Sequence, residues 1–153
     1  KRTWRERCHA TEDGTMFIPP MAFANNIKTA ASYLGLKIPG KRNAMYTKHF
    51  AAGVLVTDPV VLRAKKDSVE GEWVFVPSDG KRGGGSRVMK CFPVVREWGG
   101  TVKYLILDDV ITEEVFKQVL DYGGNVIGIG RFRPQNQGYY GRFEVIGLKW
   151  VDN

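Results

Sequence analysis

Cysteine and histidine are scarce in this chain, and their scarcity excludes several classes of protein. Only two cysteines occur, Cys8 and Cys91, and only two histidines, His9 and His49. Two cysteines supply neither a disulfide framework nor a four-cysteine zinc ribbon, and this usage suits a reducing compartment. We therefore expect a cytoplasmic protein that folds without a metal, a cofactor or a disulfide.

Long apolar runs are also missing. No stretch approaches the roughly 20 apolar residues that cross a bilayer, and no apolar signal segment follows the basic start Lys1–Arg7. We therefore expect no membrane partner. The first residue is Lys rather than Met, which leaves open whether the native N-terminus is present. With 153 residues, 43% of them hydrophobic, the chain is expected to form one domain over residues 1–153 with a single core.

Acidic residues are absent from three basic stretches, residues 38–50, 81–90 and 129–141. The chain as a whole has 23 basic and 16 acidic residues, a net charge of +7, which favours polyanionic partners. Each of these stretches also contains glycine or an aromatic residue, a combination typical of nucleic-acid binding. The predicted contacts with phosphate are made by Lys41, Arg42, Lys48, Lys81, Arg82, Arg131, Arg133 and Arg142.

Two amphipathic helices are predicted. Apolar residues recur at helical spacing from Pro20, and Gly35 follows as a stop signal. Thr112 is a good N-cap for a second helix, which is expected to end at Gly123-Gly124. The intervening stretch Lys37–Phe50 has no clear periodicity, so an inserted loop is expected there.

Strands are predicted where β-branched and aromatic residues lie between turn residues. Gly99-Gly100 is expected to form a type I′ turn that joins two strands in a hairpin. A first strand is expected near Thr15–Ile18, or upstream of Lys1. The other predicted strands cover residues 53–62, 72–77, 87–98, 101–107 and 139–151. This order predicts an α+β fold, a ferredoxin-like or RRM-like βαββαβ sheet with an inserted loop region and a Gly-rich loop before the last strand.

The Gly-rich loop at residues 128–143 combines three features of a nucleic-acid site. Glycines let the backbone approach a phosphate or a base closely, arginines supply charge, and tyrosines stack on unpaired bases. The glycines are Gly128, Gly130, Gly138 and Gly141, and the tyrosines are Tyr139 and Tyr140. The alternative interpretation is a turn that merely joins the second helix to the last strand, with the tyrosines packed on the sheet.

The Ile-Pro-Pro start of the first helix (residues 18–26), the long hairpin and the Gly-rich loop together resemble the RAMP superfamily of CRISPR-associated proteins. The subunits of that superfamily that coat guide RNA are the nearest match. The resemblance implies RNA contacts by Gly128, Gly130, Gly138 and Gly141 with Arg131, Arg133 and Arg142. In the first helix, Met21, Phe23, Asn25 and Asn26 replace the family's small-residue pattern. The implied partners are single-stranded RNA or DNA, and copies of this chain or CRISPR effector subunits.

We therefore expect a non-enzymatic protein that binds single-stranded nucleic acid, with RNA favoured. Two alternatives stay open. The first is a metal-independent endoribonuclease of the same superfamily, with His49 as general acid or base beside Lys48 and Tyr46. The second is a phage protein that mimics a CRISPR subunit and blocks its assembly. A zinc site from Cys8, His9, His49 and Cys91 is not expected, because no paired-cysteine spacing occurs.

Overall fold

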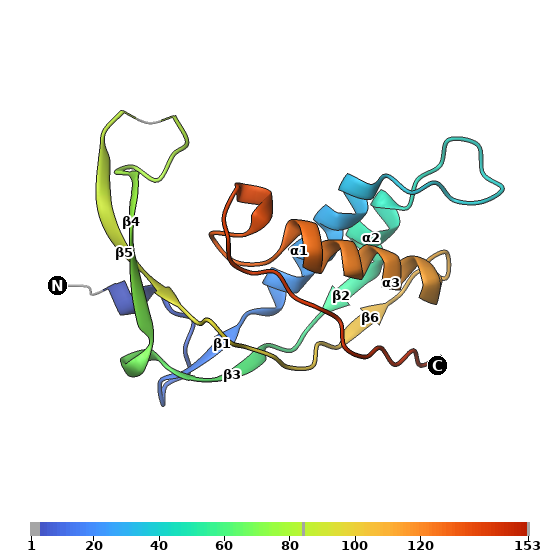
Figure 1. Ribbon diagram of the computed structural model, residues 1–153. Coiled ribbons are helices and arrows are strands. Elements are labelled where there is room, and N and C mark those ends of the chain that lie inside the picture. The colour runs from blue at the N-terminus through green and yellow to red at the C-terminus, as the bar shows by residue number, and fades with distance from the viewer. Residues whose placement is uncertain (1–3, 84, 153) are drawn as a thin grey trace. The chain divides into compact units, whose positions relative to one another are not determined.

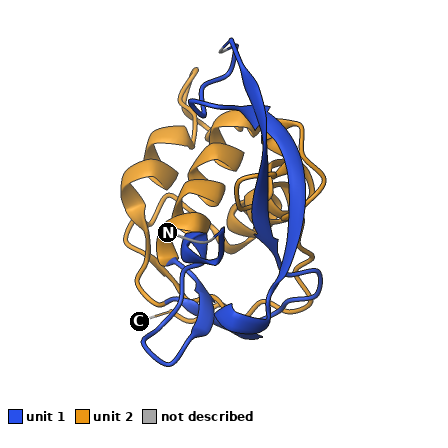
Figure 2. Ribbon diagram, turned by 90° about the vertical axis from the view of Figure 1, so that its left-hand side faces the viewer, with its two compact units in different colours: residues 1–19, 59–101 blue, residues 20–58, 102–153 orange. Residues whose placement is uncertain are grey.

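A computed structural model describes residues 4–83 and 85–152, which form helices and antiparallel strand pairs (Figure 1). The expectation of a mixed α and β protein is confirmed. The chain divides into two compact units, each built from two separate stretches (Figure 2). Unit 1 comprises residues 1–19 and 59–101, and unit 2 comprises residues 20–58 and 102–153. Because a compact unit need not fold alone, the single domain over residues 1–153 stays a prediction.

Unit 1 consists of two antiparallel strand pairs with short 3-10 turns, η1 (Trp4–Arg7) and η2 (Lys66–Ser68). Strand β1 (Thr15–Ile18) pairs with β3 (Val60–Lys65), and an isolated bridge joins Ala10 to Met16. Strand β1 is the strand that the sequence predicted near Thr15–Ile18.

The second pair of unit 1 is a long ribbon. Strand β4 (Glu70–Pro77) pairs with β5 (Arg87–Val94) over eight residue pairs, from Glu70↔Val94 to Pro77↔Arg87. The hairpin predicted across Gly99-Gly100 was therefore wrong, because β5 pairs with the strand before it and residues 78–86 make the turn. Neither Gly99 nor Gly100 has the positive φ that a type I′ turn requires.

Unit 2 places helices against one small strand pair. Helix α1 (Pro20–Leu34) ends where the sequence predicted, and α2 (Thr47–Gly53) leads directly into β2 (Val54–Val56). Strand β2 pairs with β6 (Tyr104–Ile106), so the single strand predicted over residues 53–62 is split at Thr57–Pro59 between two units.

Helix α3 (Glu113–Tyr122) begins at the predicted cap, where the amide of Val115 donates to Oγ1 of Thr112 at 3.3 Å. Helix α3 ends at Tyr122, directly before the predicted stop at Gly123-Gly124, and both glycines belong to the π-helical turn that follows, η3 (Gly123–Ile127). A short 3-10 turn, η4 (Pro134–Asn136), follows within the Gly-rich loop.

The core of unit 2 lies between its helices and its strand pair. Phe50 of α2 is 1% exposed and stacks on Phe116 of α3, with ring centroids 6.3 Å apart. The expected loop Lys37–Phe50 is therefore a loop only in its first part, because its last residues enter α2 and the core. Burial of such aromatic rings is the main stabilising contribution of a core of this size.

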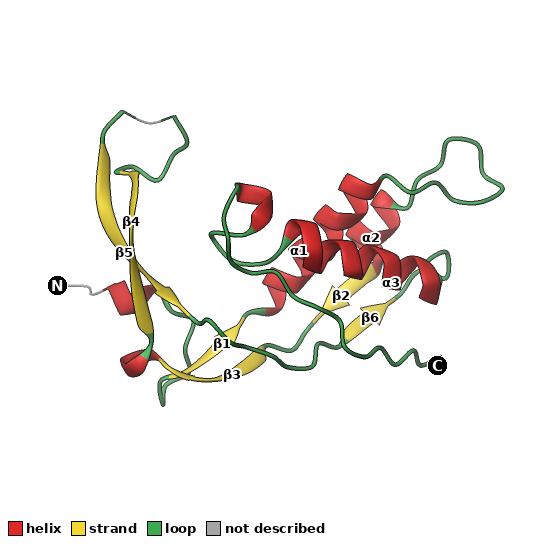
Figure 3. Cartoon of the chain, viewed as in Figure 1, coloured by secondary structure: helices red, strands yellow, loops and turns green. Residues whose placement is uncertain are grey.

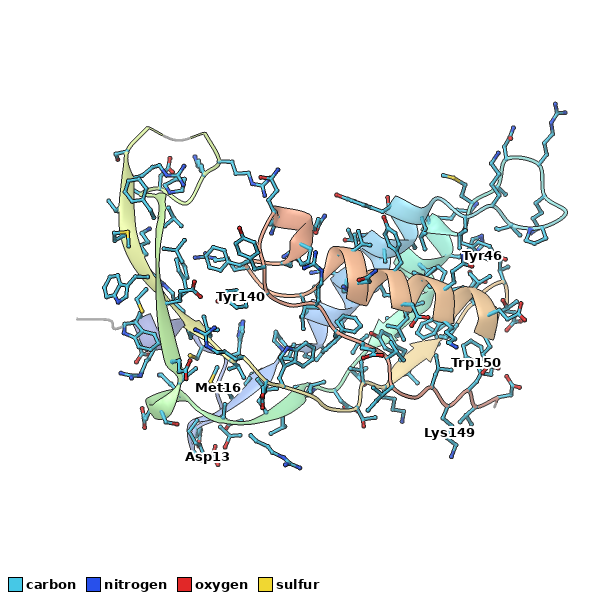
Figure 4. The ribbon with its side chains drawn as sticks, in the orientation of Figure 1. Asp13, Met16, Tyr46, Tyr140, Lys149 and Trp150 are labelled. Atoms are coloured by element: carbon cyan, nitrogen blue, oxygen red, sulfur yellow. The ribbon has the colours of Figure 1, made fainter. Side chains whose placement is uncertain are left out.

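The last predicted strand, residues 139–151, is extended chain without strand pairing in the described part of the molecule (Figure 3). Four of its side chains still pack on the core, namely Phe143, Val145, Leu148 and Trp150, the last of which is labelled in Figure 4. The ring centroids of Trp150 and Phe116 lie 6.0 Å apart. The described strands pair two by two, in three separate sheets. The ferredoxin-like βαββαβ sheet is therefore not confirmed, although the α+β composition is.

Candidate nucleic-acid interface

The Gly-rich loop, residues 128–143, begins at the end of the π-helical turn of unit 2. There the amide of Gly128 donates to the carbonyl oxygen of Gly123 at 2.7 Å. The side-chain amide of Asn26, on α1, donates to the carbonyl oxygens of Gly123 and Gly128 at 2.9 and 2.8 Å. Asn26 is 3% exposed. Helix α1 therefore positions the start of the loop from within the core.

Backbone hydrogen bonds close the loop on itself. The amide of Ile129 donates to the carbonyl oxygen of Gly141 at 3.0 Å, and that of Tyr140 donates to Phe132 at 3.0 Å. A third bond, from the amide of Gly138 to Arg133, measures 3.1 Å. The loop is thus a braced element, which differs from a simple connecting turn.

Two of the predicted glycines are needed for this bracing. A Cβ atom on Gly138 would lie 1.9 Å from the carbonyl oxygen of Phe132, and one on Gly141 would lie 1.8 Å from that of Ile129. Gly141 also has a φ of +89°, which other residues rarely adopt. The sequence assigned the glycines to contact with a ligand, whereas these two serve contact between the two sides of the loop. Gly128 and Gly130 also have positive φ values.

The three arginines of the loop differ in how they are held. Arg133 is half-buried and braces the loop, because its guanidinium donates to the side chain of Gln135 and to the carbonyl oxygen of Gly130, both at 2.9 Å. Arg142 is exposed and donates to the carbonyl oxygen of Asn125 at 2.9 Å. Arg131 is exposed. The guanidinium groups of Arg133 and Arg142 are already held by hydrogen bonds, so these two side chains lose less conformational entropy when they bind a phosphate.

The two adjacent tyrosines differ in exposure. Tyr139 is 90% exposed. Tyr140, which is labelled in Figure 4, is half-buried, and its amide takes part in the hydrogen bonds that close the loop. The sequence treated the two as equal candidates for stacking on a base. The geometry favours Tyr139.

The remaining predicted cations lie elsewhere in the molecule. Lys41 and Arg42 are exposed on the loop between α1 and α2, and Lys48 is exposed on α2. Lys81 and Arg82 belong to unit 1, in the turn between β4 and β5. Within unit 2, the charge of Lys41 acts on a carboxylate, because it contributes to lowering the pKa of Asp108. The acid-free segment 38–50 is therefore brought near an acid by the fold.

That acid, Asp108, is the partner of His49. Nδ1 of His49, on α2, lies 2.6 Å from Oδ2 of Asp108, which directly follows β6. Hydrogen bonds from His49 and from the amide of Val110 lower the pKa of Asp108. Tyr46, the third residue of the alternative catalytic set, is 4% exposed and packs edge-on against Phe50. The structure therefore pairs His49 with a carboxylate that is 59 positions away in sequence.

An open hollow of about 540 Å³ lies beside this pair, lined by residues of unit 2. Its lining includes Gly53, Leu107, Asp108 and Asp109. Burial raises the pKa of the Tyr104 phenol, on strand β6, well above its usual value. Tyr104 is thus a packing residue of the core and not an acid of this hollow.

Comparison of the chain with protein-family models, with curated proteins and with solved structures finds no match. Among the residues that the structure describes, no group of three or more histidine, cysteine or carboxylate side chains is placed to hold a metal ion. The described helices include none that is both long and apolar enough to cross a membrane.

Sequence reasoning missed Asn26 and Asp108 as parts of these two sites. Asn26 lies in the apolar stripe of α1, where a polar residue among Phe23, Ile27 and Ala30 signals a buried hydrogen-bonding role. For Asp108 the available signal was weaker, because a carboxylate at the end of a strand is also common in turns. Neither partner lies near its counterpart in sequence.

Proposed function

We propose that this protein is a non-enzymatic binder of single-stranded nucleic acid, RNA in preference to DNA, and that the Gly-rich loop is its binding surface. The observation that carries the proposal is a braced loop without acidic residues in which Tyr139 is 90% exposed and both Arg131 and Arg142 are exposed. Arginines neutralise phosphates and an exposed tyrosine stacks on an unpaired base. Because the loop is already ordered, binding costs less conformational entropy.

The resemblance to the RAMP superfamily supports the same ligand, since the subunits that it resembles coat guide RNA and the Gly-rich loop is one of the segments that carry it. We extend the proposal to the protein partners that this resemblance implies. These are further copies of this chain or subunits of a CRISPR effector. Binding of several copies to one long strand is the behaviour that this extension requires.

The salt dependence of binding to a labelled single-stranded RNA tests the proposal. If about four phosphates are neutralised, the logarithm of the affinity falls against the logarithm of the salt concentration with a slope of roughly −3. Replacing Arg131 and Arg142 together by Ala is expected to make the slope shallower by about 1.4, because each neutralised phosphate contributes about 0.7. Arg133 is kept because it also braces the loop.

Lys65→Ala combined with Lys66→Ala is the matched control, since it removes the same charge. Lys65 lies 3.5 Å from Asp13 and Lys66 lies 3.0 Å from Glu6, so the fields of both lysines are largely cancelled. This control is expected to bind as the unchanged protein does. Equal losses from the two double variants, or a slope near zero in the unchanged protein, would contradict the proposal.

The endoribonuclease is a second candidate, and the contact between His49 and Asp108 is the observation that favours it. A carboxylate that holds one ring nitrogen of a histidine orients the other nitrogen for proton transfer. The pair lies beside the open hollow of unit 2. In the endoribonuclease candidate, Asp108 rather than Tyr46 is the residue that acts together with His49.

Incubation of end-labelled RNA with the protein in the presence of a metal chelator separates the two candidates. Intact RNA with both the unchanged protein and His49→Ala supports the binding protein. Cleavage that is lost in both His49→Ala and Asp108→Asn, and kept in Lys117→Ala, would establish the enzyme instead. The Lys117 variant controls for the loss of one exposed positive charge from the same unit, on helix α3.

A further inference from the structure

An aromatic side chain outside the Gly-rich loop lies against it. Tyr33, in the last turn of α1, is 57% exposed, and its hydroxyl oxygen accepts a hydrogen bond from Nε2 of Gln135 at 3.4 Å. Gln135 belongs to η4 inside the loop. Its Oε1 in turn accepts from Nε of Arg133 at 2.9 Å. A guanidinium, a planar amide and an exposed aromatic ring are therefore linked in a row.

The hydrogen-bonding capacity of Gln135 is only half used by these contacts. A glutamine side chain offers two lone pairs on Oε1 and two hydrogens on Nε2. Arg133 occupies one lone pair and Tyr33 one hydrogen. One lone pair of Oε1 and one hydrogen of Nε2 remain on the same amide group. That pair is what a glutamine presents when it binds adenine, because adenine offers N6–H as donor and N7 as acceptor.

The exposed ring supplies the second element of a base site. Its bond to Gln135 is longer than the usual 2.7–3.2 Å range, so little is lost if the amide shifts toward a ligand. A base stacked on the face of Tyr33 would bring its edge toward the amide of Gln135. The guanidinium of Arg133 beside them would attract the phosphate of the same nucleotide.

We propose that Tyr33 and Gln135 form a subsite for one unpaired adenine of a single-stranded RNA, with Tyr33 as the stacking surface and Gln135 as the reader of the base edge. This inference rests on the proposed function of the Gly-rich loop and adds to it a second aromatic contact and a base preference.

The first experiment compares binding of oligoadenylate with binding of an abasic strand of the same length. Tyr33→Ala is expected to weaken oligoadenylate binding about tenfold, because stacking on an aromatic side chain is lost, and to leave the abasic strand unaffected. Tyr33→Phe keeps the ring and is expected to bind nearly as tightly as the unchanged protein. Met21→Ala is the control, since Met21 is 64% exposed near the start of the same helix.

The second experiment changes the ligand, so it does not depend on the stability of any variant. Oligoadenylate with 7-deazaadenine lacks the N7 acceptor and is expected to bind the unchanged protein several-fold more weakly. Gln135→Ala is expected to bind both strands equally. It is also expected to lose the preference of the unchanged protein for oligoadenylate over oligouridylate.

The outcomes separate this subsite from the function on which it rests. If Tyr33→Ala and 7-deazaadenine leave binding unchanged while Arg131→Ala with Arg142→Ala weakens it, the subsite is refuted and the loop remains a binding surface. If none of these changes affects binding, both proposals fail. A loss of abasic-strand binding in Tyr33→Ala would show a structural tether instead of a stacking surface.

Discussion

Asn26 donates a hydrogen bond of 2.8 Å to the carbonyl oxygen of Gly128 across 102 positions of the chain. The same amide also reaches Gly123, so one side chain holds both ends of the π-helical turn that leads into the Gly-rich loop. Its Oδ1 is buried without a hydrogen-bond partner among the described residues. The amide nitrogen of Asn26 therefore holds the start of the Gly-rich loop, while the oxygen of the same side chain stays buried without a hydrogen bond.

Asn26→Ala is expected to lower the free energy of unfolding by about 1–3 kcal/mol, because two buried carbonyl groups lose a donor. It is also expected to weaken RNA binding, since the loop is no longer held at its start. Chemical denaturation and RNA titration measure the two effects. Asn25→Ala, at an exposed neighbouring position, should change neither. Equal effects of the two variants would contradict this role of Asn26.

Gly141→Ala is expected to destabilise the protein by at least about 1 kcal/mol and to reduce RNA binding, because a side chain at positive φ is strained. The added Cβ would also meet the carbonyl oxygen of Ile129. Gly147→Ala is the matched control, since its Cβ would meet nothing within 4 Å. Thermal unfolding and RNA titration check both variants. A Gly141→Ala protein as stable as the control would show that the loop is not braced in this way.

Tyr139→Ala and Tyr140→Ala are expected to separate binding from stability. Tyr139 is almost fully exposed, so its loss should weaken RNA binding by about 1–3 kcal/mol per stacked base and leave the melting temperature unchanged. Tyr140 is half-buried, so its loss should mainly lower the melting temperature. The reverse pattern would assign the stacking role to Tyr140.

The contact between Asp108 and His49 predicts a dependence of stability on pH. The pKa of Asp108 is lowered from its ordinary value of 3.8, chiefly by the hydrogen bond with His49. A carboxyl with a lowered folded pKa stabilises the fold above its unfolded pKa and loses that contribution as the pH falls through the folded pKa. Asp108→Asn should therefore melt at a lower temperature than the unchanged protein at neutral pH.

This difference should narrow as the pH falls below 3.8 and through the lowered folded pKa, because the carboxyl then becomes protonated in both states. Thermal unfolding measured between neutral pH and pH 2.5 tests the expectation. Asp109→Asn is the control, because Asp109 is the exposed neighbour. A difference that stays constant with pH would show that the Asn variant fails for a reason other than charge.

Local signals predicted the helices well. The stripe from Phe23 to Leu34 and the Thr112 cap depend on residues within a few positions of each other, and both appear as expected. Strand pairing could not be predicted in the same way. Gly99-Gly100 looked like a hairpin turn, yet β6 pairs with β2, whose residues lie far earlier in the chain. Several apolar strands have a similar composition, so the sequence does not indicate which strand each of them pairs with.

The sequence identified the segment that forms the candidate site, but it did not predict the role of each residue within it. The Gly-rich loop and its arginines were identified because charge, glycine and tyrosine occur together in one segment. Tertiary contacts decide which residues of that segment hold the loop together and which face solvent. Arg133 and Gly138 serve the loop itself, while Tyr139 faces solvent, and nothing in the local sequence distinguishes these residues.

The pairing of Val56 with Tyr104 also has a consequence for the order in which the chain folds. This contact forms only after the whole stretch that carries β3, β4 and β5 has been drawn into a closed loop, and closing a long loop costs more entropy than closing a short one. The β4–β5 ribbon closes over the short turn at residues 78–86. We therefore expect the ribbon to form early and the β2–β6 pair to form late, so that the strand pair beneath the helices sets the folding rate of unit 2.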